Sequence, residues 1–223
     1  MKPIIERIAD IESISLLKEE SDAAVVMFHG YGASMHDLFP LWEMWDNGKL
    51  SWYFPNGVLP LDMGGYGGRA WFSIDMEALN RAIQTGQTRN LAISVPHEFE
   101  STISAQVNFL KEIQKRHKKI IIGGFSQGAM CASHLALHPE LDIEKLVLLS
   151  GNLMAMDRFP VAGKGIPFYQ SHGDQDQILP IVGAKALEEK LKSYGFQGNL
   201  TTFRGGHEIP MNIIQEIKVF LQS

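Results

Sequence analysis

A single stretch of this chain, residues 120–129, combines an apolar strand, a sharp turn and the start of a helix around one serine. It opens with three isoleucines, which suit a strand buried on both faces. Gly124 and Gly128 flank Ser126 in a G-x-S-x-G pattern, and helix-forming residues follow. Bulky neighbours would collide at so sharp a reversal, so glycine is needed on both sides. The pattern therefore predicts a nucleophile elbow that holds the Ser126 hydroxyl above a sheet.

The bare pattern would arise by chance in roughly one chain in ten to twenty of this length, so a glycine-rich turn with an incidental serine is the alternative. The rest of the chain favours the elbow, because strand-like and helix-like segments alternate. The strand-like segments are residues 23–29, 50–54, 120–122, 146–149, 167–171 and 200–203, and the helix-like segments are residues 99–113, 127–137, 184–194 and 212–221. This alternation predicts an α/β fold with a mostly parallel sheet and helices on both faces. Ser126 then lies at the carboxyl end of a strand, where such folds place their sites.

Composition limits the other possibilities. With 223 residues, 45% of them hydrophobic and 20% charged, the chain can form one well-cored domain over residues 1–223. A formal net charge of −5 gives no electrostatic reason to expect a nucleic-acid partner. The single cysteine, Cys131, excludes an internal disulfide and a thiolate zinc cluster, which favours a reducing compartment, the cytoplasm.

Targeting and membrane-spanning signals are weak throughout the chain. Residues 1–10 mix acidic side chains into the apolar positions and offer no continuous signal-peptide core. No stretch reaches the roughly 18 consecutive apolar residues that span a bilayer. We therefore expect no export by a signal peptide and no stable membrane insertion.

A serine hydroxyl is a poor nucleophile near neutral pH, so it needs a general base, which an acid must hold in place. In serine hydrolases built on parallel sheets the order along the chain is serine, acid, histidine, which leaves four histidines after Ser126. His134 and His138 lie on the helix after the elbow and are expected to pack or cap, and His172 precedes the candidate acids. His207 follows two glycines in a loop between a strand and the last helix, so we predict His207 as the base.

The segment after residues 167–171 contains two aspartates that could orient this base. Asp174 falls in the turn directly after a glycine, whereas Asp176 precedes the apolar residues that open the next helix. We therefore predict Asp176 as the orienting acid and Asp174 as a turn residue or an outer support. Either aspartate alone could instead build an Asx-type turn.

Acyl chemistry also needs donors for the oxyanion, usually backbone N–H groups. One candidate is the N–H of Gln127, at the start of the helix after the serine. The other is the N–H of Tyr31, because Gly30 and Gly32 let the backbone around it turn close to the site. A plain strand-to-helix turn would contain glycines too.

Together these segments resemble the phospholipase/carboxylesterase family of the α/β-hydrolases, which includes acyl-protein thioesterases and lysophospholipases. The resemblance covers nearly the whole chain. It rests on FHGYG at residues 28–32 with Asp37 and Leu38 after it, RAWF at 69–72, GFSQGA at 124–129, HGDQD at 172–176 and GHE at 206–208. The resemblance implies an α/β-hydrolase fold, with Ser126 as nucleophile, Asp176 as acid, His207 as base and backbone donors at Tyr31 and Gln127.

The resemblance also implies that Trp71 and Phe72 line or support an acyl pocket, although such a pair is more often ordinary core. The chain departs from the commoner pattern at Ser34, where many relatives carry an acidic or amide residue, and over residues 59–95. The glycine-rich residues 63–68 within that segment could form a mobile flap or lid over the site or a long surface loop.

The resulting expectation is a serine hydrolase that cleaves carboxylic esters or thioesters through an acyl-enzyme, without a cofactor. Its partner would be a small-molecule or lipid acyl ester, or an S-acylated protein. The alternatives are a serine peptidase and an inactive hydrolase fold that serves as a binding protein. Cys131 has no elbow of its own and is expected to be buried packing, and His29 and His36 lack further ligands for a metal site.

Overall fold

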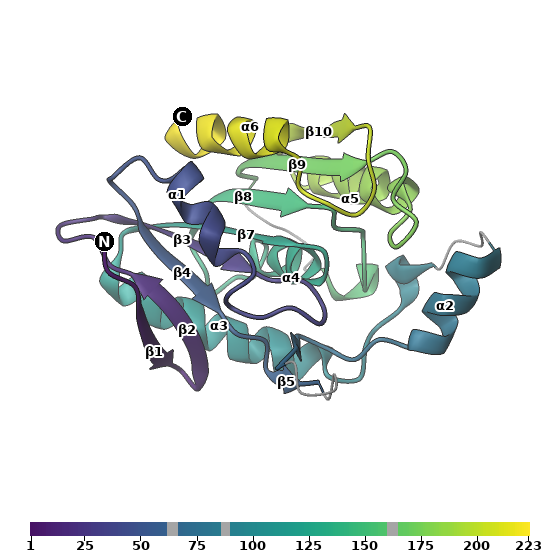
Figure 1. Cartoon of the computed structure of the whole chain (residues 1–223), viewed down its shortest axis with the longest axis horizontal. Helices are drawn as coiled ribbons and strands as arrows, with labels where there is room; N and C mark the ends of the chain where they lie inside the picture. The colour runs from purple at the N-terminus through teal and green to yellow at the C-terminus, as the bar shows by residue number, and fades with distance from the viewer. Residues whose placement is uncertain (62–66, 86–89, 160–164) are drawn as a thin grey trace.

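The computed structural model describes residues 1–61, 67–85, 90–159 and 165–223. Within these ranges an eight-stranded sheet has the order β1-β2-β4-β3-β7-β8-β9-β10 (Figure 1). Its strands are β1 (Ile4–Ile8), β2 (Ile11–Leu16), β3 (Ala23–Phe28), β4 (Ser51–Pro55), β7 (Lys119–Phe125), β8 (Ile143–Leu149), β9 (Pro167–Gly173) and β10 (Gln197–Phe203). From β4 to β10 neighbouring strands are parallel, while β1 and β2 are added in antiparallel pairing. The predicted α/β fold with a mostly parallel sheet is confirmed.

Helices cover both faces of this sheet. The helices are α1 (Trp42–Trp45), α2 (Met76–Thr85), α3 (Phe99–Arg116), α4 (Gln127–Leu135), α5 (Ile181–Ser193) and α6 (Met211–Gln222), with 3-10 turns at Phe39–Leu41, Leu91–Ile93 and Met156–Arg158. Figure 1 shows α6 lying along β9 and near α1. Helices α3, α4 and α5 contribute to a different core cluster from α1 and α6. The sheet thus separates two cores.

Strand β7 shows why the isoleucine run is continuous. Ile120 and Ile122 belong to the core cluster under α3 and α4, whereas Ile121 belongs to the cluster under α1 and α6. Successive side chains of a strand point to opposite faces, so a strand covered on both faces needs apolar residues at every position. This burial fixes β7 in the middle of the sheet and with it the position of the serine that follows.

Two features of the fold lie outside the predicted segments. The β1–β2 hairpin turns at Ala9 and Asp10, which both have left-handed φ values, 44° and 67°. Left-handed φ at both central residues is typical of a type I′ hairpin, but neither the usual Asn-Gly nor Asp-Gly pair marks it here. The segment 59–95 contains α2 and a small antiparallel pair, β5 (Leu59–Pro60) with β6 (Arg69–Ala70).

Residues 62–66, which include most of the glycine-rich residues 63–68, lie outside the described residues, as do residues 86–89. Whether residues 59–95 act as a flap therefore stays a prediction. In the described ranges, no helix combines the length and the apolar character that crossing a membrane requires.

Candidate active site

The strand-to-helix reversal after β7 places Ser126 in a backbone conformation that residues with a side chain rarely adopt. Its φ is 56° and its ψ is −117°, and it caps the N-terminus of α4. A Cβ at Gly124 would lie 2.4 Å from the carbonyl carbon of Gly128, and a Cβ at Gly128 would lie 2.0 Å from the carbonyl oxygen of Phe28 on β3. Both glycines are therefore required by close backbone contacts, and the reversal has the predicted elbow geometry.

The structure brings the three predicted catalytic side chains into one hydrogen-bonded row. His207, from the loop after β10, has Nε2 2.8 Å from Ser126 Oγ and Nδ1 2.6 Å from Asp176 Oδ2. The carboxylate only accepts, so Nδ1 carries the hydrogen and Nε2 is free to accept the serine proton. The Asp176 side chain is fully buried, and that of His207 is 17% exposed. The row can therefore move a proton from a serine hydroxyl to a partly buried imidazole that a buried carboxylate holds in place.

The loop that follows β9 holds the Asp176 carboxylate in its ionised form. The second oxygen, Oδ1, accepts the backbone N–H groups of Ile178 and Leu179, each at 2.9 Å. Burial raises the pKa of Asp176, but hydrogen bonds from His172, His207 and Leu179 outweigh burial and hold this pKa well below its ordinary value of 3.8. The acid is therefore an anion at neutral pH and can stabilise a protonated His207.

Asp174, the other candidate acid, makes contacts of a different kind. It is exposed, its Oδ1 accepts the N–H of Gly205 at 3.3 Å, and its own N–H donates to Phe203 O at 2.9 Å. These bonds tie the loop after β9 to the loop that carries His207. The structure thus places Asp176, and not Asp174, against the ring of His207.

Two of the histidines that were not predicted as the base, His134 and His172, lie in different buried environments. His134 is buried on α4, with Nε2 2.9 Å from Met154 O and its ring packed against Phe99 and Phe159. His172 is buried at the end of β9, with Nε2 2.6 Å from Leu179 O and 3.3 Å from Asp176 Oδ2. The sequence did not reveal the contact between His172 and Asp176. The available signal was the position of His172, four residues before Asp176 at the carboxyl end of a strand.

Buried His134 makes stability depend on pH. Burial lowers the pKa of His134 from 6.5 to about 4, so between these values the unfolded chain binds a proton that the folded chain does not. The free energy of unfolding therefore falls as pH falls through this window, by about 3 kcal/mol for this residue. His134→Leu is expected to be less stable than the wild type at pH 7, with the difference shrinking toward pH 4 in urea unfolding. A constant difference would contradict this origin of the pH dependence.

Two backbone N–H groups are candidate oxyanion donors. Gln127 is the first residue of α4, where N–H groups have no acceptor within the helix. Near Tyr31, the N–H of Gly32 donates to Arg69 O at 2.9 Å and that of Ala33 to Gly30 O at 3.3 Å. Among the described residues, no acceptor occupies the N–H of Tyr31 or of Gln127. Both residues line the same cavity as Ser126, as donors for a substrate oxygen must.

The side chain of Gln127 has a role that the sequence did not reveal. Its Oε1 accepts the N–H of Trp71 at 2.8 Å, and its Nε2 donates to Phe72 O at 2.8 Å. Trp71 is buried beneath the site, where its Nε1 donates to His29 O at 2.9 Å. Phe72 lines the cavity, while Trp71 is not among its lining residues. The elbow helix thereby fixes the segment that bounds the cavity.

Two cavities share the Ser126 and His207 side chains. The larger, about 520 Å³, is mostly apolar, and its apolar lining includes Phe72, Ala78, Leu79, Leu91, Met130, Met154 and Ile178. The smaller, about 360 Å³, is lined by residues that include Gly30, Asp37, Leu38, Leu41, Phe125 and Ile209. Ser126 therefore has a distinct space available for each of two substrate portions. Much of the lining of the larger cavity comes from residues within 72–79 and 90–94, in the segment that departs from the commoner pattern in sequence.

The other candidate chemistries have no support in the geometry. Cys131 is buried, and burial raises the pKa of its thiol to about 12, so it is not a thiolate. Burial lowers the pKa of His29 to about 4, and its two ring nitrogens are bonded to Gly30 O and the N–H of Gly57. In the part of the chain that the structure describes, no group of three or more His, Cys, Asp or Glu residues could hold a metal ion.

The chain is similar to known proteins in sequence and in fold. The family model described as Phospholipase/Carboxylesterase matches residues 9–223. Acyl-protein thioesterase 1 of Gibberella zeae is 25% identical over 223 residues, which covers 90% of each chain. Acyl-protein thioesterase 1 of Eremothecium gossypii is 27% identical over 164 residues, which covers 70% of this chain and 63% of that one. A carboxylesterase from Mesorhizobium loti, 19% identical, has the same fold over 100% of both chains with a TM-score of 0.79.

Proposed function

Because the chain belongs to the phospholipase/carboxylesterase family, we propose that it is a serine esterase that cleaves esters or thioesters of acyl chains through an acyl-enzyme. The observation that carries the proposal is the row from Ser126 through His207 to Asp176, at 2.8 and 2.6 Å, at the edge of a mostly apolar cavity. The coarser assignment to ester hydrolysis agrees with the family and with the names of the relatives.

The geometry suggests how the reaction proceeds. His207 Nε2 removes the proton as Ser126 Oγ attacks the carbonyl carbon, and the Asp176 anion stabilises the resulting imidazolium. The N–H groups of Tyr31 and Gln127 receive the oxyanion. His207 then gives its proton to the departing alcohol or thiol, which leaves an acyl-serine. Water attacks this ester by the same proton transfers, releases the acid and restores Ser126, so both half-reactions use the same groups.

The two cavities suggest which substrate portion binds where. We assign the acyl chain to the larger cavity, because its lining is mostly apolar and its volume is within the usual range for a small-molecule site. The smaller cavity, whose lining includes the carboxylate of Asp37, then receives the alcohol or thiol portion. The acyl-protein thioesterase relatives support S-acylated proteins as substrates beside small-molecule and lipid esters.

Covalent labelling tests the proposed function directly. A fluorophosphonate probe is expected to modify the folded protein once, at Ser126, as peptide mass mapping would show. Ser133, a buried serine on the same helix, serves as the internal control and is expected to stay unmodified. The protein is also expected to hydrolyse p-nitrophenyl esters. If it takes up no probe and hydrolyses no ester, the enzyme assignment is wrong and the fold serves another role.

The assignment of the acyl cavity predicts a dependence on chain length. Each methylene that enters the apolar cavity can contribute up to about 0.8 kcal/mol, so kcat/KM is expected to rise by about fourfold or less per methylene until the cavity is full. Ala78→Trp fills part of this cavity from α2 and is expected to move the optimum to shorter esters.

The control for this experiment is Leu41→Trp, which alters the smaller cavity instead. It is expected to change the preference for the alcohol portion while the acyl optimum stays in place. The acyl-chain optimum of each variant is measured from the hydrolysis rates of p-nitrophenyl esters of increasing acyl length. A shift of the acyl optimum in Leu41→Trp but not in Ala78→Trp would reverse the assignment of the two cavities.

A further inference from the structure

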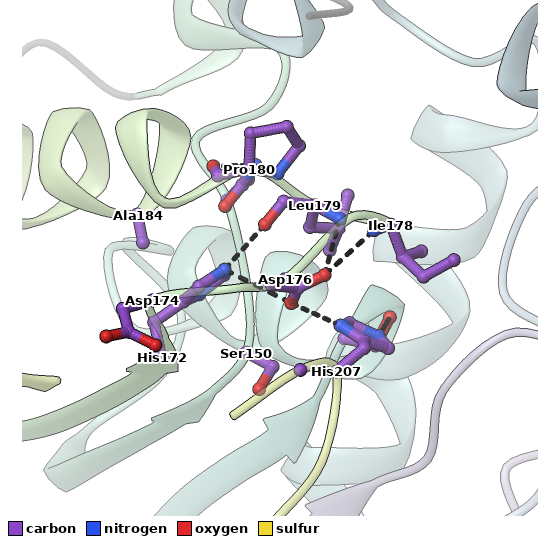
Figure 2. Close-up of polar contacts among 12 residues, drawn as sticks. Ser150, His172, Asp174, Asp176, Ile178, Leu179, Pro180, Ala184 and His207 are labelled. Atoms are coloured by element: carbon purple, nitrogen blue, oxygen red, sulfur yellow. Dashed lines mark hydrogen bonds and ion pairs between the residues drawn. The ribbon is translucent and has the colours of Figure 1, made fainter. Parts of the chain in front are cut away.

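The carboxylate of Asp176 is held by donors on both of its oxygens. Oδ1 accepts the N–H groups of Ile178 and Leu179, and Oδ2 lies 2.6 Å from His207 Nδ1 and 3.3 Å from His172 Nε2. Figure 2 shows the two imidazoles on either side of the carboxylate. An ionised carboxylate has about four acceptor positions, so this set of donors fills them. Only one of the two rings reaches the serine.

We propose that His172 is a positioning residue of the active site, whose Nε2–H holds Asp176 Oδ2 in the orientation that His207 requires. The proposal rests on the proposed function, because it concerns the acid of the same catalytic row. His172 lines neither of the two cavities that contain Ser126, so it does not touch the substrate. Its influence on the reaction must therefore pass through Asp176.

The partners of His172 determine where its ring hydrogen lies. Leu179 O, at 2.6 Å from Nε2, can only accept, so Nε2 carries the hydrogen and shares it between this oxygen and Asp176 Oδ2. The same N–H thus contacts the loop at two points. One is the carboxylate itself, and the other is the residue whose own N–H binds Oδ1. Loss of this donor would remove one contact of Oδ2 and one anchor of the residue whose N–H binds Oδ1.

The other ring nitrogen argues against a role in packing alone. His172 is completely buried, and its Nδ1 has no hydrogen-bond partner among the described residues. A buried polar atom without a partner destabilises the fold, whereas an apolar side chain of similar size would fill the same space without that cost. The imidazole is therefore better explained by the contacts of its Nε2–H than by its shape.

Two amide substitutions distinguish the role of the His172 Nε2–H donor from the role of side-chain packing. In His172→Gln the side-chain N–H₂ reaches about as far as Nε2, whereas in His172→Asn it ends near the position of Nδ1. We expect His172→Asn to lower kcat by about 10- to 100-fold with little change in KM, since small displacements of a catalytic group have effects of this size. His172→Gln is expected to retain most of the wild-type kcat. The proposal would be overturned if both variants kept the wild-type kcat or if both lost it to the same extent.

A double substitution tests whether the effect passes through the acid. In an Asp176→Ala background no carboxylate remains to be positioned, so adding His172→Asn is expected to lower kcat no further. An additional loss as large as in the wild-type background would show a merely structural role and overturn the proposal. The control is His117→Asn, a buried histidine bonded to Tyr53 Oη at the opposite end of the sheet. This variant is expected to lower the melting temperature and leave kcat unchanged.

The proton between His207 Nδ1 and Asp176 Oδ2 gives a readout that does not need turnover. Its NMR resonance is expected at low field in the wild type and in His172→Gln, and to shift or disappear through exchange with water in His172→Asn. An unchanged resonance in His172→Asn would overturn the proposal, whatever the activity of this variant. Absence of ester hydrolysis by the wild type would instead refute the proposed function, so the two failures are distinguishable.

Discussion

Replacement of Ser126 by alanine is expected to lower kcat for ester hydrolysis by about 10⁶-fold, because the nucleophile of a triad acts as a unit with its base. The variant is also expected to lose fluorophosphonate labelling. Activity above the uncatalysed rate would remain only to the extent that the N–H groups of Tyr31 and Gln127 still bind the oxyanion. Stopped assays with an activated p-nitrophenyl ester at high enzyme concentration can measure the residual rate.

Ser133→Ala is the matched control for this substitution. Ser133 is buried on α4, the helix that Ser126 caps, and its Oγ donates to Met130 O at 2.7 Å, so its loss removes a nearby serine hydroxyl without touching His207. We expect its kcat to stay close to that of the wild type. Equal activity of Ser126→Ala and the wild type would exclude Ser126 as the nucleophile.

The second largest effect is expected for Asp176→Asn, with a loss of about 10⁴-fold in kcat. The amide can donate a hydrogen to His207 Nδ1, which favours the tautomer with hydrogen on Nε2 and so blocks acceptance of the serine proton. The negative charge that stabilises the imidazolium is lost as well. KM is expected to change little, because Asp176 lines neither cavity.

Asp174→Asn provides the comparison within the same loop. Its side chain is exposed and accepts the N–H of Gly205, so an amide oxygen can replace the carboxylate oxygen in this contact. We expect its kcat to remain within about threefold of the wild type, as for surface substitutions with small effects on stability. A larger loss in Asp174→Asn than in Asp176→Asn would assign the role of the acid to the other aspartate.

The elements that the sequence predicted well are those whose signals are local. The reversal at Ser126 is encoded within five residues. Gly124 and Gly128 are required there because a Cβ at either position would collide with backbone atoms of the turn or of the neighbouring strand β3. Strands buried on both faces, such as β7, are visible as continuous apolar runs. The choice of His207 and Asp176 followed from the order of strands along the chain, and in the structure His207 contacts both Ser126 and Asp176.

The features that the sequence did not reveal depend on tertiary contacts. The amide of Gln127 meets the backbone of Trp71 and Phe72 across more than 50 residues of chain. His172 meets Asp176 only because the intervening loop closes, and a histidine in a strand has many other possible uses. Part of the wall of the larger cavity comes from α2 and its surroundings, where no helix was predicted although α2 is amphipathic.

The arrangement of the strands also bears on when the site comes into existence during synthesis. Ser126 and His207 are 81 residues apart, and His207 follows β10, which in the described part of the chain is an edge strand paired with β9 alone. A nascent chain folded only through β9 would therefore display the serine and the acid without the base. The growing chain would therefore hydrolyse no ester until β10 has docked on β9. The onset of hydrolysis in a translation or refolding experiment would accordingly report this docking step.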